Sequence, residues 1–417
     1  MVISKLTVAK YLLIFFTTYQ FLMGIIFLKS SIFYLLFSPY VLLTLFLLVH
    51  FSVNSRVARI SNKISVLAAV FIILILSLSQ KDVFSPNFLS FLLKSLQYSY
   101  GGFLVALGVF YVLSIRYFRS IDFIFLQKAF LKTMLILASS VTILEFIYLS
   151  ILELPPEYLG HISSTVSEYN GNTWYKMRSF GIASYPQVSG ALLSILVILY
   201  FFSVGKIDII FMVGCIAIFL GMTGTGVFLL LMFLPLLFKK TITYSIITFL
   251  LFLCFSFFGK ILYEIYPDIT LFHRLSLEQF ARYINLFIDV GYDRVGDFNI
   301  QQWIFGRELF SYSYGSSPTH DWAYLAIIIE YGFVGLFSYL IMYGVIIHGA
   351  IFNEISSIKK IYFLLMVLGI NVHYPAINFY VVQFVFGILF ALNVHIGRLK
   401  ISNTCSMDLA QKTIGNI

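Results

Sequence analysis

The sequence predicts an all-α, polytopic integral membrane protein, because it is rich in hydrophobic residues, poor in charges and built from long, unbroken apolar runs. Of its 417 residues, 60% are hydrophobic and 11% are charged, whereas a typical soluble domain carries about 25% charged residues. A soluble enzyme, a disordered scaffold and a coiled coil are therefore excluded. Because the runs do not alternate with polar residues, an outer-membrane β-barrel is excluded as well.

The apolar runs predict about 12 transmembrane helices, since a span needs roughly 20 residues. The segment Thr223-Gly224-Thr225-Gly226 interrupts one long apolar stretch. We interpret it as a tight turn between two short spans, because a single kinked helix would be too long. The predicted spans are 11–28, 32–53, 65–80, 98–115, 129–152, 187–204, 207–222, 226–238, 241–258, 322–349, 361–377 and 379–396.

The charge distribution indicates how these spans are oriented. With twelve spans and both termini in the cytoplasm, most of the 27 Lys and Arg residues fall in cytoplasmic loops, as the positive-inside rule requires. The net charge of +9 then reflects orientation in the membrane and predicts no nucleic-acid partner. We expect a single membrane domain over 1–417, with two large outer loops at 153–187 and 259–320. Binding and catalytic residues are expected in such loops.

Arginine residues gather in these outer loops, although the positive-inside rule would deplete them there. Guanidinium groups bind phosphate through two parallel hydrogen bonds, so several of them on one face indicate an anionic ligand such as a lipid-linked phosphate or diphosphate. The alternative is pairing with carboxylates of the same loops, above all for Arg294, which Asp293 and Asp297 flank. The outer arginines are Arg178, Arg274, Arg282, Arg294 and Arg307.

Within the second loop, 271–288 predicts an amphipathic helix, because polar and apolar residues separate onto opposite faces. Arg282 would lie on the polar face, four residues after Glu278. The helix could hold Arg282 over the entrance for a lipid-linked substrate, or it could simply rest on the membrane surface. Ser276 and Gln279 could instead form a capping box that starts the helix later.

His320 is the candidate for acid–base chemistry, and His161 in the first loop is a weaker rival. His320 immediately precedes a strongly apolar span, and imidazole can accept a proton from an attacking hydroxyl near neutral pH. Asp321 or Glu330 could orient the ring or raise its basicity. Glu330 lies inside a span, where a carboxylate needs a polar cavity or a basic partner. It could equally fix helix packing, and Glu145 raises the same question.

Several stretches, taken in order, resemble the signatures of the O-antigen polymerase and O-antigen ligase superfamily. One resembles the first-loop motif of that superfamily, others resemble its second signature, and an Arg-plus-aromatic pair lies between them. The matching stretches are Arg178-Ser-Phe-Gly181 with Tyr185-Pro186, then Arg282-Tyr283, then Gly306-Arg307, then His320-Asp321 with Tyr324, and finally Glu330-Tyr331-Gly332.

The resemblance implies a GT-C-like glycosyltransferase of the bacterial inner membrane, with its active site facing the periplasm. It would polymerise O-antigen repeat units for lipopolysaccharide, moving the growing glycan from undecaprenyl diphosphate to a sugar hydroxyl of a new lipid-linked unit. A chain-length regulator protein could be a further partner. The alternatives are an O-antigen ligase, which transfers glycan to the lipid A core, and a non-enzymatic flippase for the lipid-linked oligosaccharide.

In that reaction His320 would be the general base, with Asp321, Tyr324 and Glu330 in supporting positions. Loop arginines would bind the donor diphosphate and stabilise the negative charge of the leaving group. Because diphosphate already leaves readily, neither a metal nor another cofactor is expected. The donor-binding candidates are Arg178 and Arg282, followed by Arg274 and Arg307.

Overall fold

The computed structural model describes a set of helices and the turns between them, with no strand among the described residues. An all-α fold is thus what the described part of the chain adopts. The predicted spans 32–53 and 65–80, and all of 98–115 except Val105, lie outside the described residues. The described residues are 5–27, 105, 120–154, 179–183, 185–221, 223–265, 276, 278, 281–282, 284–285, 288–289, 295–307, 323–373 and 376–414.

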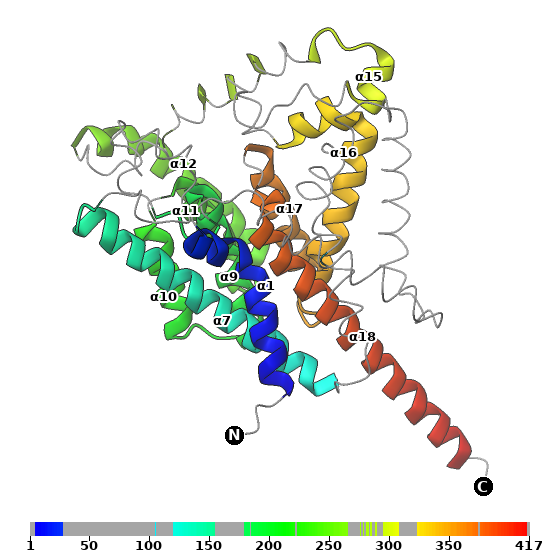
Figure 1. The fold of residues 1–417 in the computed structure, drawn as a ribbon. Coiled ribbons are helices and arrows are strands. Elements are labelled where there is room, and N and C mark those ends of the chain that lie inside the picture. The colour runs from blue at the N-terminus through cyan, green and yellow to red at the C-terminus, as the bar shows by residue number, and fades with distance from the viewer. Residues whose placement is uncertain are drawn as a thin grey trace.

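The described elements follow one another along the chain as shown in Figure 1. Two α-helices end in a short segment with different hydrogen bonding, which is π-helical after α7 and 3-10 helical after α11. The elements are α1 (Lys5–Phe27), α7 (Ser120–Phe146), η1 (Ile147–Ile151), α9 (Pro186–Val204), α10 (Ile209–Leu220), α11 (Gly224–Phe233), η3 (Leu234–Leu237), α12 (Thr241–Ile265), α15 (Ile300–Phe305), α16 (Ala323–Ala350), α17 (Ser357–His373), η5 (Ala376–Asn378) and α18 (Tyr380–Ile414).

Five segments in the described part of the chain are long and apolar enough to cross a membrane. Two further apolar helices, α10 and α11 with η3, are shorter. These helices make the protein a helical membrane protein, whereas the total of twelve spans, the GT-C-like arrangement and the orientation stay predictions. The five segments are Phe123–Ile151, Pro186–Val204, Thr241–Gly259, Ala323–Ala350 and Tyr380–Gly397.

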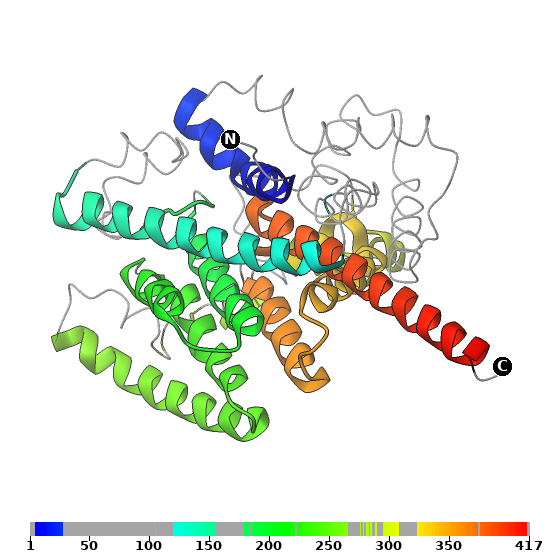
Figure 2. The same cartoon turned by 90° about the horizontal axis from the view of Figure 1, so that it is seen from below.

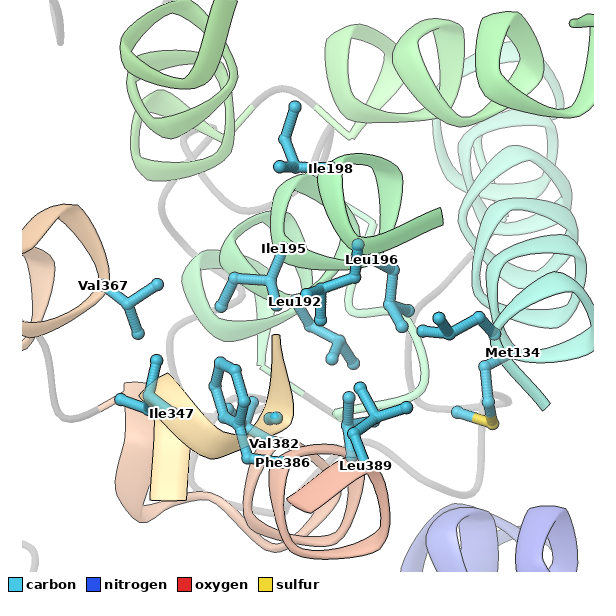
Figure 3. Close-up of a cluster of buried hydrophobic side chains, with 14 of the residues drawn as sticks. Met134, Leu192, Ile195, Leu196, Ile198, Ile347, Val367, Val382, Phe386 and Leu389 are labelled. Atoms are coloured by element: carbon cyan, nitrogen blue, oxygen red, sulfur yellow. The ribbon is translucent and has the colours of Figure 1, made fainter. Parts of the chain in front are cut away.

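Two helices, α9 and α18, form the centre of the bundle. Protein buries 83% of the spanning segment of α9 and 94% of that of α18, but only 18% of that of α12. Figure 2 accordingly shows α12 at the edge of the bundle. In Figure 3, side chains of α9 meet side chains of α7, α16, α17 and α18; the labelled ones are Met134, Leu192, Ile195, Leu196, Ile198, Ile347, Val367, Val382, Phe386 and Leu389.

The chain turns between α10 and α11 where the sequence predicts a tight turn. Helix α10 ends at Leu220, and Thr223 is extended with φ −104° and ψ 120° before α11 begins. A Cβ placed on Gly226 would lie 2.8 Å from the Cα of Gly190 in α9. Small residues let helix backbones approach this closely in membranes, so this turn packs directly on the central helix.

Helix α12 continues beyond its predicted end. The predicted span stops at residue 258 and the predicted second loop begins at 259, whereas α12 extends to Ile265. Lys260 and Glu264 fall in this extension. A hydropathy pattern ends where charge begins, but helical hydrogen bonding can continue past the apolar run, which explains the difference.

At the turn between α9 and α10, Asp208 caps the start of α10. Its Oδ1 accepts hydrogen bonds from the backbone N–H groups of Ile210 and Phe211 at 3.1 and 3.0 Å, and its Oδ2 accepts one from the Tyr200 hydroxyl at 2.7 Å. Burial acts to raise the pKa of Asp208, but the Tyr200 hydroxyl, the two N–H groups and the Lys206 ammonium outweigh it. The pKa of Asp208 is therefore below its usual 3.8.

We predict that Asp208→Ala destabilises the folded protein by about 1–2 kcal/mol, because it removes the cap of α10 and the acceptor of the Tyr200 hydroxyl. Because the pKa of Asp208 is lower in the folded than in the unfolded protein, ionised Asp208 stabilises the folded state above the ordinary pKa. This stabilisation is lost as the pH falls through the lower pKa of the folded state. The wild-type advantage should therefore shrink in acid below about pH 3.8. Unfolding of the detergent-solubilised protein at neutral and acid pH measures both effects, with Asp208→Asn as the control that keeps a capping oxygen. Equal stability of Asp208→Ala and wild type at neutral pH would contradict the assignment.

Candidate functional site

Four of the predicted site residues lie within the described residues, namely Arg282, Arg307, Tyr324 and Glu330. The other four, Arg178, Arg274, His320 and Asp321, lie outside them. The convergence of the arginines on His320 therefore stays a prediction. The structure does define the contacts that surround the two signature regions.

In the second signature, the Gly306-Arg307 turn contacts a bend in α16 backbone to backbone. Gly332 has φ 64° and ψ −165°, which is not helical, and it divides α16 into two halves; Figure 1 shows the resulting change of direction. A Cβ on Gly306 would lie 2.4 Å from the carbonyl carbon and oxygen of Glu330, and a Cβ on Gly332 would lie 2.3 Å from the carbonyl oxygen of Ile304. Two glycines with positive φ are therefore required at this contact.

The bend in α16 also provides a hydrogen-bond acceptor for the loop. In a continuous helix the carbonyl of Ile329 would accept the N–H of Phe333, four residues on. Instead, the Arg307 N–H donates to the Ile329 carbonyl at 2.8 Å. The Arg307 side chain is exposed, and its guanidinium carbon lies 5.9 Å from the centre of the Phe298 ring. The position of Arg307 is thus fixed through its backbone, while its side chain is exposed.

An aromatic cluster holds α15 and the residues just before it against α16 on both sides of the bend at Gly332. The Trp303 ring stacks on Phe333 with centroids 5.4 Å apart and an interplanar angle of 14°. It also meets the edge of Phe298 at 5.6 Å. Phe298 is buried with Leu325 and Ile329. The segment 298–303 therefore packs on α16 through Phe298 and Trp303, although no residue of α15 itself is buried.

Tyr324 connects the first half of α16 to α17. Its hydroxyl donates to the Leu368 carbonyl at 2.6 Å, and its ring meets Tyr339 edge-on at 6.1 Å. The Asn371 amide donates to the Tyr339 hydroxyl at 2.9 Å and accepts from the backbone N–H of Ile377 at 3.1 Å. Tyr324 therefore takes part in a network that fixes the bent half-helix on the bundle.

In the first signature, Ser179–Ala183 forms a turn that we call the Gly181 turn. It contacts the end of α7 through Glu145 and the start of α9 through Ser189. The sequence marks Glu145 only as a carboxylate within a span and does not reveal its hydrogen bond with the Gly181 backbone N–H at 2.6 Å.

The start of α9 also contacts the segment that joins α17 to α18. Tyr185, in the first signature, has its ring centroid 5.8 Å from that of Phe379. Phe379 directly follows η5, whose Ile377 is bonded to Asn371. A chain of contacts thus connects the Gly181 turn, through η5 and α17, to the Tyr339 ring on which Tyr324 packs.

Within the predicted helix 271–288, the described residues Glu278, Arg282, Ile284 and Ile288 are helical. Glu278 and Arg282 are exposed, and so are the apolar Ile284 and Ile288, at 56% and 58%. Ser276 is buried. An exposed guanidinium on one side and exposed apolar side chains on another are typical of a helix at a membrane interface.

Together, the fold and these contacts define a polytopic α-helical membrane protein, in which parts of both stretches that resemble the superfamily signatures are described. No protein-family model, curated protein or solved structure matches the chain. Among the described residues there is no group of three or more His, Cys, Asp or Glu side chains that could hold a metal ion.

We predict that Gly332→Ala destabilises the protein by about 1–3 kcal/mol, because a side chain strains this backbone conformation and meets the Ile304 carbonyl. The matched control is Gly344→Ala in the same helix, where a Cβ meets nothing within 4 Å. That change should be neutral or slightly stabilising. Thermal unfolding in detergent compares the two, and equal stabilities would contradict the proposed contact.

Proposed function

We propose that the protein is a membrane-embedded glycosyltransferase that polymerises lipid-linked O-antigen repeat units on the periplasmic side of the bacterial inner membrane. The observation that carries this proposal is the contact between the Gly306-Arg307 turn and the bend at Glu330–Gly332. These pieces of the second signature are separated in sequence, yet they meet backbone to backbone. An arginine side chain is exposed beside that contact.

The proposed chemistry is a direct displacement at the anomeric carbon of the donor glycan. A hydroxyl oxygen of the acceptor sugar forms the new bond to that carbon, while the bond to the diphosphate oxygen breaks. His320 accepts the hydroxyl proton, and undecaprenyl diphosphate leaves with the bonding electron pair. Guanidinium groups of Arg178 and Arg282, with Arg274 or Arg307, compensate the negative charge on the leaving group.

The exposure of Arg282 and Arg307 supports their assignment to an external anionic ligand. The two side chains lie on different parts of the second loop, one on a helical segment and one at the end of α15. Arginine pairs with diphosphate oxygens through its planar donor fork. A lipid-linked diphosphate would also suit the exposed Ile284 and Ile288 near Arg282, since its chain must remain in the bilayer.

We predict that His320→Ala lowers the rate of glycan polymerisation by a factor of about 10²–10⁴, the range that a general base contributes. The assay uses the purified full-length protein with synthetic lipid-linked repeat units, and it resolves the products by size. His161→Ala is the matched control and should remain active. Undiminished polymerisation by His320→Ala would show that the base is wrongly assigned.

Deletion of the gene distinguishes the proposed reaction from its alternatives. Lipopolysaccharide that carries one repeat unit indicates a polymerase. Loss of all attached glycan, with accumulation of lipid-linked polymer, indicates a ligase. Failure of the lipid-linked unit to reach the periplasm indicates a flippase, and either of the last two results would contradict the proposal.

We predict that Arg178→Lys raises the KM for the lipid-linked donor about 10-fold, because it keeps the charge but loses the hydrogen bonds of the bidentate fork. Arg294→Lys serves as the control, since Asp293 and Asp297 are close to it in the sequence and are expected to pair with it. Steady-state kinetics with varied donor concentration measure the difference. An unchanged KM in Arg178→Lys would remove Arg178 from the donor site.

A further inference from the structure

Glu145 is a carboxylate within a spanning segment, and only 4% of it is exposed. Charged groups at such positions are costly and need hydrogen-bonding or charged partners. Oε2 of Glu145 accepts a hydrogen bond from the Gly181 backbone N–H at 2.6 Å. A charged acceptor makes this bond stronger than a neutral one. Glu145 thus connects the end of α7 directly to the first signature.

The Gly181 turn has little freedom to move while these contacts persist. Gly181 has φ 61°, and a Cβ there would lie 2.6 Å from both Cβ and Oγ of Ser189. The Ser189 hydroxyl donates to the Phe180 carbonyl and accepts from the Ala183 N–H at 3.2 Å. The Ser179 hydroxyl donates to the Thr142 carbonyl at 2.8 Å. The turn is therefore attached to α7 on one side and to α9 on the other.

Helix α7 changes its hydrogen bonding directly after Glu145. From Ile147 to Ile151 the helix has π-helical bonding, and the Leu152 N–H donates to the Ile147 carbonyl, five residues back, at 2.9 Å. Such short π-helical segments are rare and occur frequently at functional sites. The π-helical segment therefore marks the end of α7, next to Glu145, as a candidate functional region.

We propose that Glu145 is a positioning residue of the donor site, which acts by holding the Gly181 turn in place. Arg178 directly precedes Ser179, and adjacent Cα atoms are about 3.8 Å apart, so fixing Ser179 restricts where Arg178 can lie. This inference rests on the proposed function, which assigns Arg178 to the donor diphosphate. Glu145 itself does not touch the substrate in this scheme.

Two variants test the proposal from opposite sides of the contact. Glu145→Ala removes the acceptor, and Gly181→Ala disturbs the turn while it keeps the carboxylate. Both should speed backbone hydrogen exchange in residues 179–183 by a factor on the order of 10–100, the range for a lost hydrogen bond to a charged group. Glu145→Gln keeps an acceptor oxygen and should show a smaller increase. Glu153→Gln, an exposed carboxylate on the same segment, is the matched control and should match wild type.

The kinetic readout separates a positioning role from a purely structural one. In Glu145→Ala, the donor kcat/KM should fall on the order of 10-fold or more, with Glu145→Gln restoring part of it. Exchange in α16 should stay at the wild-type rate. Wild-type exchange over 179–183 in Glu145→Ala would overturn the proposal, as would a wild-type donor kcat/KM despite faster exchange.

Binding of farnesyl diphosphate to the full-length protein in detergent keeps this test independent of turnover. If the wild-type protein forms no glycan product, the proposed function fails. Weaker farnesyl diphosphate binding in Glu145→Ala, together with faster exchange in the Gly181 turn, would then still support the role of Glu145. Unchanged binding would overturn it.

Discussion

Backbone hydrogen bonding in a medium without water governs where this chain can leave the helical conformation. Each N–H and carbonyl group that a bend releases within a bilayer must find a partner in the protein. At Gly332 that partner is the Arg307 N–H, which reaches the Ile329 carbonyl. At the end of α7, the Thr142 carbonyl accepts the Ser179 hydroxyl. A loop N–H thus replaces a lost helical hydrogen bond at the bend in α16, and a loop hydroxyl is attached close to the place where α7 changes its hydrogen bonding.

Hydropathy predicts some of the described helices closely, because lipid selects for apolar length, whereas the predicted span 361–377 continues past the end of α17 at His373. The predicted span 187–204 corresponds to Pro186–Val204, and the turn at Thr223 was expected from its small residues. The bend at Gly332 was not expected. The apolar run 322–349 continues on both sides of the bend, interrupted only by the charge of Glu330. The bend depends on contacts with Ile304 and Gly306, which lie far away in the sequence.

The sequence singles out charged residues of the candidate site but not their contacts. Charge within an apolar run singles out Glu145 and Glu330 from the sequence, since a carboxylate there is costly. A basic partner or a polar cavity was the expectation for such a carboxylate, and one contact that Glu145 makes is with a backbone N–H. Every residue except proline carries an N–H, so no sequence pattern identifies that partner. The sequence does not identify the Leu368 carbonyl as the acceptor of the Tyr324 hydroxyl either.

The central place of α18 has a consequence for biogenesis. Ribosomes synthesise α18 after every other described helix, yet it packs against α1, α7 and α16. Until it is inserted, lipid must cover the faces of those helices that it later buries. Insertion of α18 therefore replaces lipid contacts of α1, α7 and α16 with protein contacts.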